Sequence, residues 1–468
     1  MARSVTQLTA YLHGFRVGWF RQTDGAISFE FDDEWREASG RLQLSESLPK
    51  SRKVHTGTAP ENFLWGLLPD NSAVLVRWGE MFGANPRNAL SLLRHVGLDT
   101  AGAVQLSEVD ETVLDAAGGS DPLDDRVIAA HLRAMHGDPL AWLVPSLHDG
   151  NFSLAGAQAK FALLRDADGW RLPWGGEPTT HIVKPGVAGF SHQDVDEHLC
   201  LVAATQLGLN AAKSEIHDFG GESAIVIERY DRDFADGHIN RIHQEDVLQA
   251  AGIHPALKYQ NEGGPGITTT ADLIRRAVNR SSRDDALRRF FDANIFNWII
   301  SGTDAHAKNY SLLHTARGTT LAPLYDVASS LPYDDLPARK VKLAMSMAGR
   351  YRVHEIEPRH ILREATGISL DTDVVRERMI ELCESVADAF SAAASASRLK
   401  RDDRDFAARL TDSVARRSAE LLPKIHATTS RSLAAHLRPE ARAITQPRRK
   451  NVGLSGNGGR FASKQPSN

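Results

Sequence analysis

The pattern of apolar and polar positions divides the chain into a mixed first part and a mainly helical last part. Apolar residues alternate with polar ones over residues 8–12, 15–20 and 26–31, which predicts three strands. His13-Gly14 and Asp24-Gly25 separate these runs, and such pairs are typical of tight hairpin turns. Helical spacing follows within residues 61–71 and 88–97. The start of the chain therefore predicts a small α/β module.

A change in composition marks the end of this module. Residues 115–125 are rich in glycine, serine, proline and aspartate, which is typical of a linker. We therefore predict an N-terminal subdomain over residues 1–115.

The next region, residues 116–245, is predicted to be a sheet with one helix. Strands are expected within residues 160–166, 180–185 and 223–230, and a helix over residues 192–209 that ends at Gly208. Residues 246–440 are predicted to be mostly helical, with a long amphipathic helix over residues 284–302. A sheet-rich piece followed by a helical piece predicts an α/β (α+β) fold with two lobes and a cleft between them.

Composition is ordinary for a globular protein and excludes several classes. The chain has 468 residues, of which 42% are apolar and 24% are charged. Its two cysteines, Cys200 and Cys383, lie in helix-like contexts without disulfide or zinc spacing, so we expect them to be reduced. No apolar run approaches the ~20 residues of a membrane span, and the start does not resemble a signal peptide. We expect a cytoplasmic protein without membrane contact.

Charge is distributed unevenly along the chain. Residues 431–468 contain eight basic residues and one acidic residue, so this segment carries +7 and the remainder −11 of a net −4. A basic tail on an acidic body favours nucleic acid or an acidic partner. The alternative is a solvated tail, and we expect residues 441–468 to be disordered because they are poor in apolar side chains.

The most specific candidate chemistry lies in the stretch SGTDAHAKNYSLL. Asp304 follows an apolar helix and a glycine, and Asn309 comes five residues later, which is the spacing of the protein-kinase catalytic loop. Asp326 ends an apolar run seventeen residues further on. Hard oxygen ligands suit Mg²⁺, and a separate carboxylate suits proton transfer from an attacking hydroxyl. The ordered set predicts magnesium-dependent phosphoryl transfer.

Two strand ends supply further candidates for a nucleotide site. Lys184 ends one β-rich run and is suited to hold phosphates as a point charge, although a surface lysine is the alternative. Glu228, Arg229 and Tyr230 end another, where an adenine could pair with the backbone. The alternative there is a simple strand end with Arg229 as a surface charge.

Three more polar residues have two or more interpretations each. His306 is either a phosphate contact or a group that holds the Asp304 loop, and Gln244 either faces the cleft or lies near a helix N-cap. Ser153 precedes a short stretch of small residues and could be a turn cap, a phosphate ligand or a substrate. The sequence contains no Ser-His-Asp motif, no His-Glu-x-x-His motif and no Walker loop.

Taken together, the motifs resemble those of a known family. They are SLAGAQAK, PTTHIVKP, ERYDR, HQED, YQNEGGPGI, TDAHAKNYS, LYDVASS and KLAMS, in that order from residue 153 to residue 346. The first part adds SLPK, LLPDN and LSLLRHVGLDTAGAV. Over about residues 5–430 the chain resembles the HipA-type serine/threonine kinase toxins of bacterial toxin–antitoxin modules.

The resemblance implies a two-lobed protein-kinase-like fold that uses ATP and Mg²⁺. It implies that Asp304 is the catalytic base, that Asn309 and Asp326 are the metal ligands, and that Lys184 holds phosphate. The remaining nucleotide-binding residues it implies are Ala155, Gly156, Ala157, Gln158, Ala159, Lys160, Glu228, Arg229, Tyr230, His306, Ala307, Lys308 and Tyr325, with Gln244 as a further candidate. Ala159 replaces a common glutamate and Ala305 a common glycine or aspartate, and neither is an essential group, so activity is expected.

The resemblance also implies a biological role. Such a kinase phosphorylates an aminoacyl-tRNA synthetase, glutamyl-tRNA synthetase above all, which inhibits translation and leads to growth arrest and persistence. Ser153 would be autophosphorylated and would then switch the kinase off. The implied partner is a HipB-like helix-turn-helix antitoxin, through which the chain reaches operator DNA. The alternatives are a corepressor that acts only with that antitoxin, and a small-molecule kinase.

Overall fold

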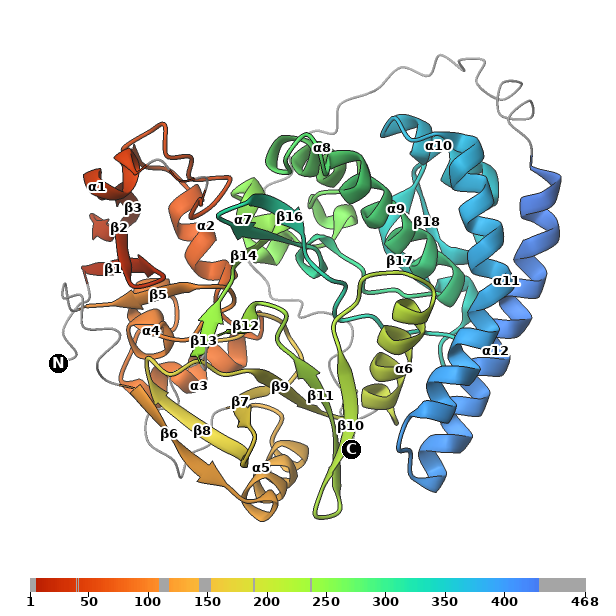
Figure 1. Ribbon diagram of the computed structural model, residues 1–468, viewed down its shortest axis with the longest axis horizontal. Coiled ribbons are helices and arrows are strands. Elements are labelled where there is room, and N and C mark those ends of the chain that lie inside the picture. The colour runs from red at the N-terminus through yellow and green to blue at the C-terminus, as the bar shows by residue number, and fades with distance from the viewer. Residues whose placement is uncertain are drawn as a thin grey trace, which may run out of the picture.

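The computed structural model describes residues 6–38, 40, 42–108, 118–142, 153–187, 190–235 and 238–428 (Figure 1). The N-terminal elements lie on one side, a six-stranded sheet lies below them, and the helices from α8 onward form the other side. The predicted α/β (α+β) two-lobed class is confirmed. The predicted disordered tail lies outside the described residues.

The N-terminal subdomain is a five-stranded antiparallel sheet with helices packed on it. The strand order is β4-β3-β2-β1-β5, and the elements are β1 (Gln7–Leu12), β2 (Phe15–Thr23), β3 (Ala26–Phe31), α1 (Asp33–Glu37), β4 (Val54–His55), α2 (Ala59–Gly66), α3 (Ser72–Phe82), α4 (Ala89–Val96) and β5 (Val104–Ser107). Both predicted hairpins are confirmed. In each turn the two central residues have positive φ, 51° and 78° at His13-Gly14 and 51° and 84° at Asp24-Gly25, as a type I′ turn requires.

The second sheet has six strands, in the order β10-β11-β9-β7-β8-β6, and all neighbours are antiparallel. Its elements are β6 (Gly118–Leu123), α5 (Asp125–Gly137), β7 (Phe161–Asp166), β8 (Gly169–Gly175), β9 (His181–Pro185), α6 (Gln193–Gln206), β10 (Ser214–Phe219) and β11 (Glu222–Glu228). The linker prediction is wrong for residues 118–123, because these residues form β6. They pair with β8 on one side only, and an edge strand tolerates the glycines and proline that suggested a linker.

The remaining elements are mainly helical, as predicted. They are β12 (Arg232–Ala235), β13 (His238–Arg241), β14 (His243–Asp246), α7 (Val247–Ala251), α8 (Ile267–Ala277), α9 (Arg283–Ile300), β15 (Ser311–Thr315), β16 (Gly318–Leu321), β17 (Lys342–Met347), β18 (Arg350–Arg352), α10 (Pro358–Gly367), α11 (Thr372–Ala396) and α12 (Arg401–Ala427), with short 3₁₀ turns that include η3 (Gln260–Glu262) and η4 (Ala307–Asn309). α11 and α12 lie side by side (Figure 1).

Helix α9 differs from the sequence-based expectation. The helix exists where predicted, but from Phe290 onward it is buried on nearly every side rather than amphipathic, including Phe291 and Trp298. It is the central helix of the C-terminal lobe, and α8, α11 and α12 pack against it. A helix that is apolar on all sides is expected in the core of a large domain.

Two apolar cores hold the fold together. One fills the C-terminal lobe, and the other joins the N-terminal subdomain to the six-stranded sheet, so that Phe20 and Leu64 belong to the same cluster as Phe161 and Val226. The N-terminal subdomain is therefore packed firmly on the sheet. Cys200 and Cys383 are both buried and unpaired with each other. Among the helices of the described ranges, none is long and apolar enough to cross a membrane.

Candidate active site

Lys184 lies at the centre of a buried charge cluster. It comes from β9, and its Nζ is 2.7 Å from Glu197 Oε1 on α6 and also contacts the carboxylate of Asp326. The Lys184 and Glu197 side chains are 4% and 1% exposed, whereas Asp326 keeps 30%. The alternative of a surface lysine is therefore wrong. Asp326 is the member of the cluster that remains accessible.

The charges of this cluster support one another. Burial opposes the charged form of Lys184, but Asp326 and Glu197 outweigh it and raise the pKa of Lys184. Burial likewise opposes ionisation of Asp326, yet Lys184 and Lys160 hold the pKa of Asp326 well below its ordinary value. Burial raises the pKa of Glu197, and the attraction of Lys184 offsets only part of that rise. Asp326 is thus fixed as an anion beside a fixed cation.

Asp304 lies in the loop between α9 and η4, and the loop is folded back on itself. The Asp304 carbonyl accepts hydrogen bonds from Asn309 Nδ2 at 2.8 Å and from the His306 backbone N–H at 2.7 Å. The Asp304 side chain is 47% exposed, and its Oδ1 accepts a hydrogen bond from the Tyr259 hydroxyl at 2.6 Å. One carboxylate oxygen is held, and the carboxylate remains accessible to an incoming hydroxyl.

Asn309 and Asp326 are suited to hold a hard cation. Asn309 uses its Nδ2 on the Asp304 carbonyl, so its side-chain oxygen is the atom left for a ligand. Asp326 contributes a permanently ionised carboxylate with accessible surface. Oxygen donors of this kind fit Mg²⁺, so the residues present fit the expected metal.

Lys308 has a partner that sequence reasoning missed. Its ammonium group contacts the carboxylate of Asp70, which belongs to the N-terminal subdomain, and Lys258 Nζ lies 3.3 Å from the other oxygen of the same carboxylate. Lys308 is buried, and its carbonyl accepts a hydrogen bond from the Tyr325 hydroxyl at 2.7 Å.

His306 is also buried, and burial lowers its pKa, so the imidazole is neutral near pH 7.

The stretch after Ser153 is packed against the N-terminal subdomain. Ser153 is fully buried, and its hydroxyl donates a hydrogen bond to the Leu67 carbonyl at 2.6 Å. Lys160 Nζ turns back and donates to the Ala155 carbonyl at 2.7 Å. Gly156 has φ +111°, a conformation that residues with a Cβ rarely adopt, so glycine is favoured there. Burial lowers the pKa of Lys160 to about 8.

The other residues of this stretch are small or uncharged. Gln158 donates from Nε2 to Gln193 Oε1 at 2.8 Å, which ties the loop to the start of α6. Ala159 packs against the core that the N-terminal subdomain shares with the sheet. The loop thus contacts both the N-terminal subdomain and α6.

The segment after β11 is held by buried charges. Arg229 is 3% exposed, and its guanidinium donates to Asp231 at 3.0 and 2.8 Å and to Asp99 at 3.3 Å. The alternative of a surface charge is therefore wrong. The guanidinium is already engaged by these partners, and the Arg229 backbone N–H donates to the Thr180 carbonyl at 2.9 Å. The Glu228 side chain is 42% exposed.

Two tyrosines and a glutamine line the same region. The Tyr230 hydroxyl donates to Gln244 Oε1 at 2.6 Å, and the Tyr230 and Tyr325 rings lie 5.7 Å apart between centroids. Gln244 lies in β14, two residues before Asp246, which is the N-cap of α7. Gln244 is therefore near a helix N-cap, as the alternative predicted, but it is not the cap itself. Tyr325 also shares a hydrogen bond with Ser311.

A different group has the composition of a metal site. One ligand atom from each of Glu46, Glu245 and His314 lies within 4.8 Å of the others. However, the Glu245 carboxylate already accepts hydrogen bonds from the Ser45 hydroxyl, the Glu46 backbone N–H and His314 Nε2 at 2.6, 2.8 and 2.9 Å. These bonds explain the cluster as a buried polar contact between the N-terminal subdomain and β14.

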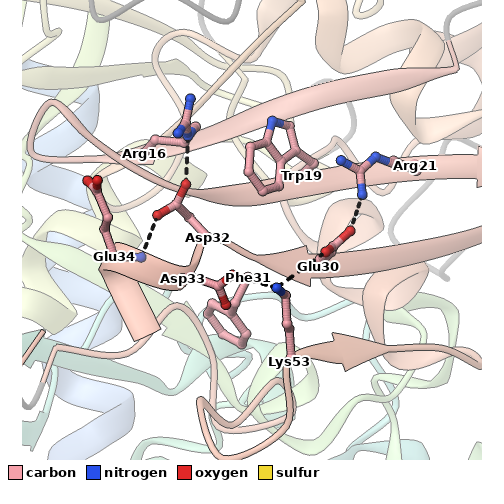
Figure 2. Close-up of a pocket in the computed structure, with 9 residues that line it drawn as sticks. All are labelled: Arg16, Trp19, Arg21, Glu30, Phe31, Asp32, Asp33, Glu34 and Lys53. Atoms are coloured by element: carbon pink, nitrogen blue, oxygen red, sulfur yellow. Dashed lines mark hydrogen bonds and ion pairs between the residues drawn. The ribbon is translucent and has the colours of Figure 1, made fainter. Parts of the chain in front are cut away.

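A surface pocket of about 320 Å³ lies on the N-terminal sheet, away from the residues above (Figure 2). Its cations are paired with carboxylates: Arg16 with Asp32 at 2.9 Å, and Lys53 with Asp33 at 2.6 Å. The Trp19 ring lies 5.0 Å from the Arg16 guanidinium. The pocket contains none of the predicted site residues.

The structure brings together several of the candidate residues that the sequence suggested, and it adds neighbours that the sequence did not suggest. Lys184 and Asp326 meet directly, and Asp304 and Asn309 meet through one hydrogen bond. Glu197, Asp70, Lys258 and Tyr259 were not expected. Glu197 had a usable signal, because a protein-kinase lysine pairs with a glutamate on the following helix.

Two family models match the chain. The HipA-like C-terminal domain matches residues 152–393, and the HipA N-terminal domain matches residues 8–107. Together they cover the N-terminal subdomain, most of the helical lobe and the six-stranded sheet except its edge strand β6.

Full-length relatives agree with these matches. The chain is 36% identical over 392 residues to the kinase candidate Y4mE of Sinorhizobium fredii, covering 82% of this chain and 91% of the relative. It is 26% identical over 388 residues to the serine/threonine-protein kinase toxin HipA of Shewanella oneidensis, covering 80% and 85%. The solved structure of Shewanella oneidensis HipA with HipB and operator DNA has the same fold, with a TM-score of 0.77 at 23% identity over 90% of this chain and 98% of that one.

Proposed function

Because the chain belongs to the HipA family, we propose that it is an ATP- and Mg²⁺-dependent serine/threonine protein kinase and the toxin of a toxin–antitoxin module. One observation carries the proposal: a buried lysine–glutamate pair, Lys184 and Glu197, contacts the acidic side chain of Asp326. Protein kinases use such a lysine on phosphates and such an aspartate on magnesium.

Each residue has a defined task in this proposal. Lys184 binds phosphate oxygens, and Asn309 and Asp326 hold Mg²⁺, which when bound neutralises charge on the phosphates. Asp304 accepts the proton of the acceptor hydroxyl, and Tyr259 holds one of its oxygens so that the carboxylate keeps one orientation. Tyr230, Gln244 and the backbone at Glu228 and Arg229 line the adenine side.

The acceptor is proposed to be a protein of translation, an aminoacyl-tRNA synthetase such as glutamyl-tRNA synthetase. Its phosphorylation would inhibit translation and cause growth arrest. The choice of this acceptor rests on the family to which the chain belongs and is not drawn from a contact among the described residues.

We propose Ser153 as a site of autophosphorylation. A phosphoserine carries about −1.5 to −2 charges at neutral pH and no longer donates to the Leu67 carbonyl. The fully buried position has no room for that charge, so the modified loop leaves the N-terminal subdomain and ATP binding falls. Transfer to Ser153 also requires the loop to leave Leu67 first.

A HipB-like antitoxin is the proposed partner. Support comes from the relative of the same fold, whose structure contains HipA, HipB and operator DNA. Co-expression with the neighbouring open reading frame, followed by size-exclusion chromatography, tests this proposal. Co-elution is expected, whereas separate elution from every candidate partner counts against it.

The kinase proposal is tested with labelled ATP, Mg²⁺ and a cell lysate, followed by mapping of the modified residues. We expect label on serine or threonine of a translation protein, and none when Mg²⁺ is removed. Label found only on small molecules would favour the small-molecule kinase instead. No transfer to any acceptor, in a preparation that is folded, would favour the corepressor.

A further inference from the structure

Several buried polar contacts join the N-terminal subdomain to the rest of the chain, and three of them centre on a carboxylate. Asp99 bonds with Arg229 and Arg232 behind the end of β11, and Glu245 bonds with Ser45 and Glu46 beside β14. The third contact is the Asp70 cluster, which we define as Asp70, Lys258 and Lys308. The first two contacts join the subdomain to structural elements, but the third enters the candidate active site.

Asp70 contacts two functional segments at once. Its backbone N–H donates to the Gly156 carbonyl at 2.9 Å, and Pro69 forms a parallel bridge with Gly156. Its carboxylate contacts Lys308, the residue next to Asn309 in η4. One residue of the N-terminal subdomain therefore binds the proposed phosphate loop, residues 155–160, with its backbone and the proposed catalytic loop, residues 304–309, with its side chain.

The second lysine extends the contacts to the catalytic base. Lys258 Nζ lies 3.3 Å from Asp70 and 5.6 Å from the centroid of the Tyr259 ring, and the Tyr259 hydroxyl donates to Asp304. The Tyr259 ring also meets His306 edge to face, with centroids 5.1 Å apart. Contacts thus run from Asp70 to Asp304 along one side and to Asn309 along the other.

The charge on Asp70 is permanent at neutral pH. Burial opposes ionisation, but the ammonium groups of Lys308 and Lys258 outweigh it and hold the pKa of Asp70 below its ordinary value. The Lys308 and Asp70 side chains are 4% and 10% exposed, so the pair is screened little by solvent. Such a pair fixes the geometry of the groups attached to it.

We propose that Asp70 is a positioning residue of the kinase site, through which the N-terminal subdomain orients Lys308 and the catalytic loop while it binds the phosphate loop. This inference rests on the proposed kinase function. The N-terminal subdomain is then part of the active site. Release of the phosphate loop from Asp70 would weaken this connection between the N-terminal subdomain and the kinase site.

The test is a double-mutant cycle on phosphoryl transfer with Asp70→Asn and Lys308→Gln. Asp70→Asn keeps the backbone contact and the side-chain size but removes the charge. We expect it to lower kcat about tenfold or more, with KM for ATP changed less than about threefold. In the Lys308→Gln background the same change should lower kcat clearly less than in the wild-type chain, because the route through Lys308 is already lost and only the route through Lys258 remains.

Asp32→Asn is the matched control. Asp32 is another buried carboxylate of the N-terminal subdomain, and its contacts are with Arg16 and the start of α1, so it reports general loosening of the subdomain. Its effect on kcat should be the same in the wild-type chain and in the Lys308→Gln background, because Asp32 has no contact with Lys308. Effects of Asp70→Asn that simply multiply with those of Lys308→Gln would overturn the proposal.

A second measurement works without nucleotide. Hydrogen exchange of the peptide that spans residues 304–310 should speed up in Asp70→Asn and stay unchanged in Asp32→Asn. Unchanged exchange in Asp70→Asn would refute the positioning role. If the wild-type chain transfers no phosphate, the kinase proposal fails, and hydrogen exchange alone still decides whether Asp70 holds the catalytic loop.

Discussion

Replacement of Lys184 by methionine tests the buried charge cluster on which the candidate site depends. The change keeps the length of the side chain and removes the ammonium group that contacts Glu197 and Asp326. Glu197, at 1% exposure, is then a buried carboxylate without its cation. Removing one partner of a buried ion pair typically costs about 3–5 kcal/mol of unfolding free energy.

The cost should depend on pH in a defined direction. Burial already raises the pKa of Glu197, and loss of Lys184 raises it further. The folded variant therefore binds a proton that the unfolded chain releases near its ordinary pKa of about 4.3. The contribution of the Glu197 proton to the stability of the variant is fully present below the pKa of Glu197 in the unfolded chain. It is lost as pH rises through the raised pKa of Glu197 in the folded variant. The destabilisation should be larger at pH 8 than at pH 5.5.

Urea unfolding at both pH values measures this effect. Lys184→Met combined with Glu197→Gln should recover part of the loss at pH 8 and lose most of the pH dependence, because no buried carboxylate remains at position 197. Lys53→Met is the control, since Lys53 pairs with Asp33 at 40% exposure and should change stability by less than about 1 kcal/mol. Equal, pH-independent effects of Lys184→Met and Lys53→Met would refute the reasoning.

Two further predictions concern ATP binding, measured by calorimetric titration. Asp326→Ala should weaken ATP binding only when Mg²⁺ is present, since it removes a proposed metal ligand. A variant that binds ATP as tightly as the wild-type chain in the presence of Mg²⁺ would contradict that role. Ser153→Asp should lower ATP affinity, because a carboxylate replaces the hydroxyl that donates to Leu67, whereas Ser153→Thr keeps a donor and serves as the control. Unchanged affinity in Ser153→Asp would show that this contact does not govern the loop.

Local signals in the sequence predicted a large part of the fold. The His13-Gly14 and Asp24-Gly25 turns specify their own backbone conformation, so both hairpins were predictable. The edge strand β6 was not, because the glycines and proline that it contains are equally typical of a linker. The burial of α9 was also unpredictable in detail, since it depends on helices that follow much later in the chain.

The candidate site divides in the same way. The spacing of Asp304 and Asn309 within one loop predicted a local unit, and the pair is joined through the Asp304 carbonyl. Asp70 lies 238 positions from Lys308, and nothing near either residue indicates the contact. Contacts between distant segments depend on the packing of whole subdomains, and a single sequence does not encode that packing in any local pattern.

The most direct test of the kinase account is Asp304→Asn. Asparagine keeps an oxygen that can accept the hydrogen bond from the Tyr259 hydroxyl, so the loop around residue 304 should stay folded while the proton acceptor is lost. Transfer of the γ-phosphate from labelled ATP to protein should fall by about 10²–10⁴-fold, with the affinity for ATP changed less than about threefold. Transfer by Asp304→Asn at a rate within about threefold of the wild-type rate would contradict the account.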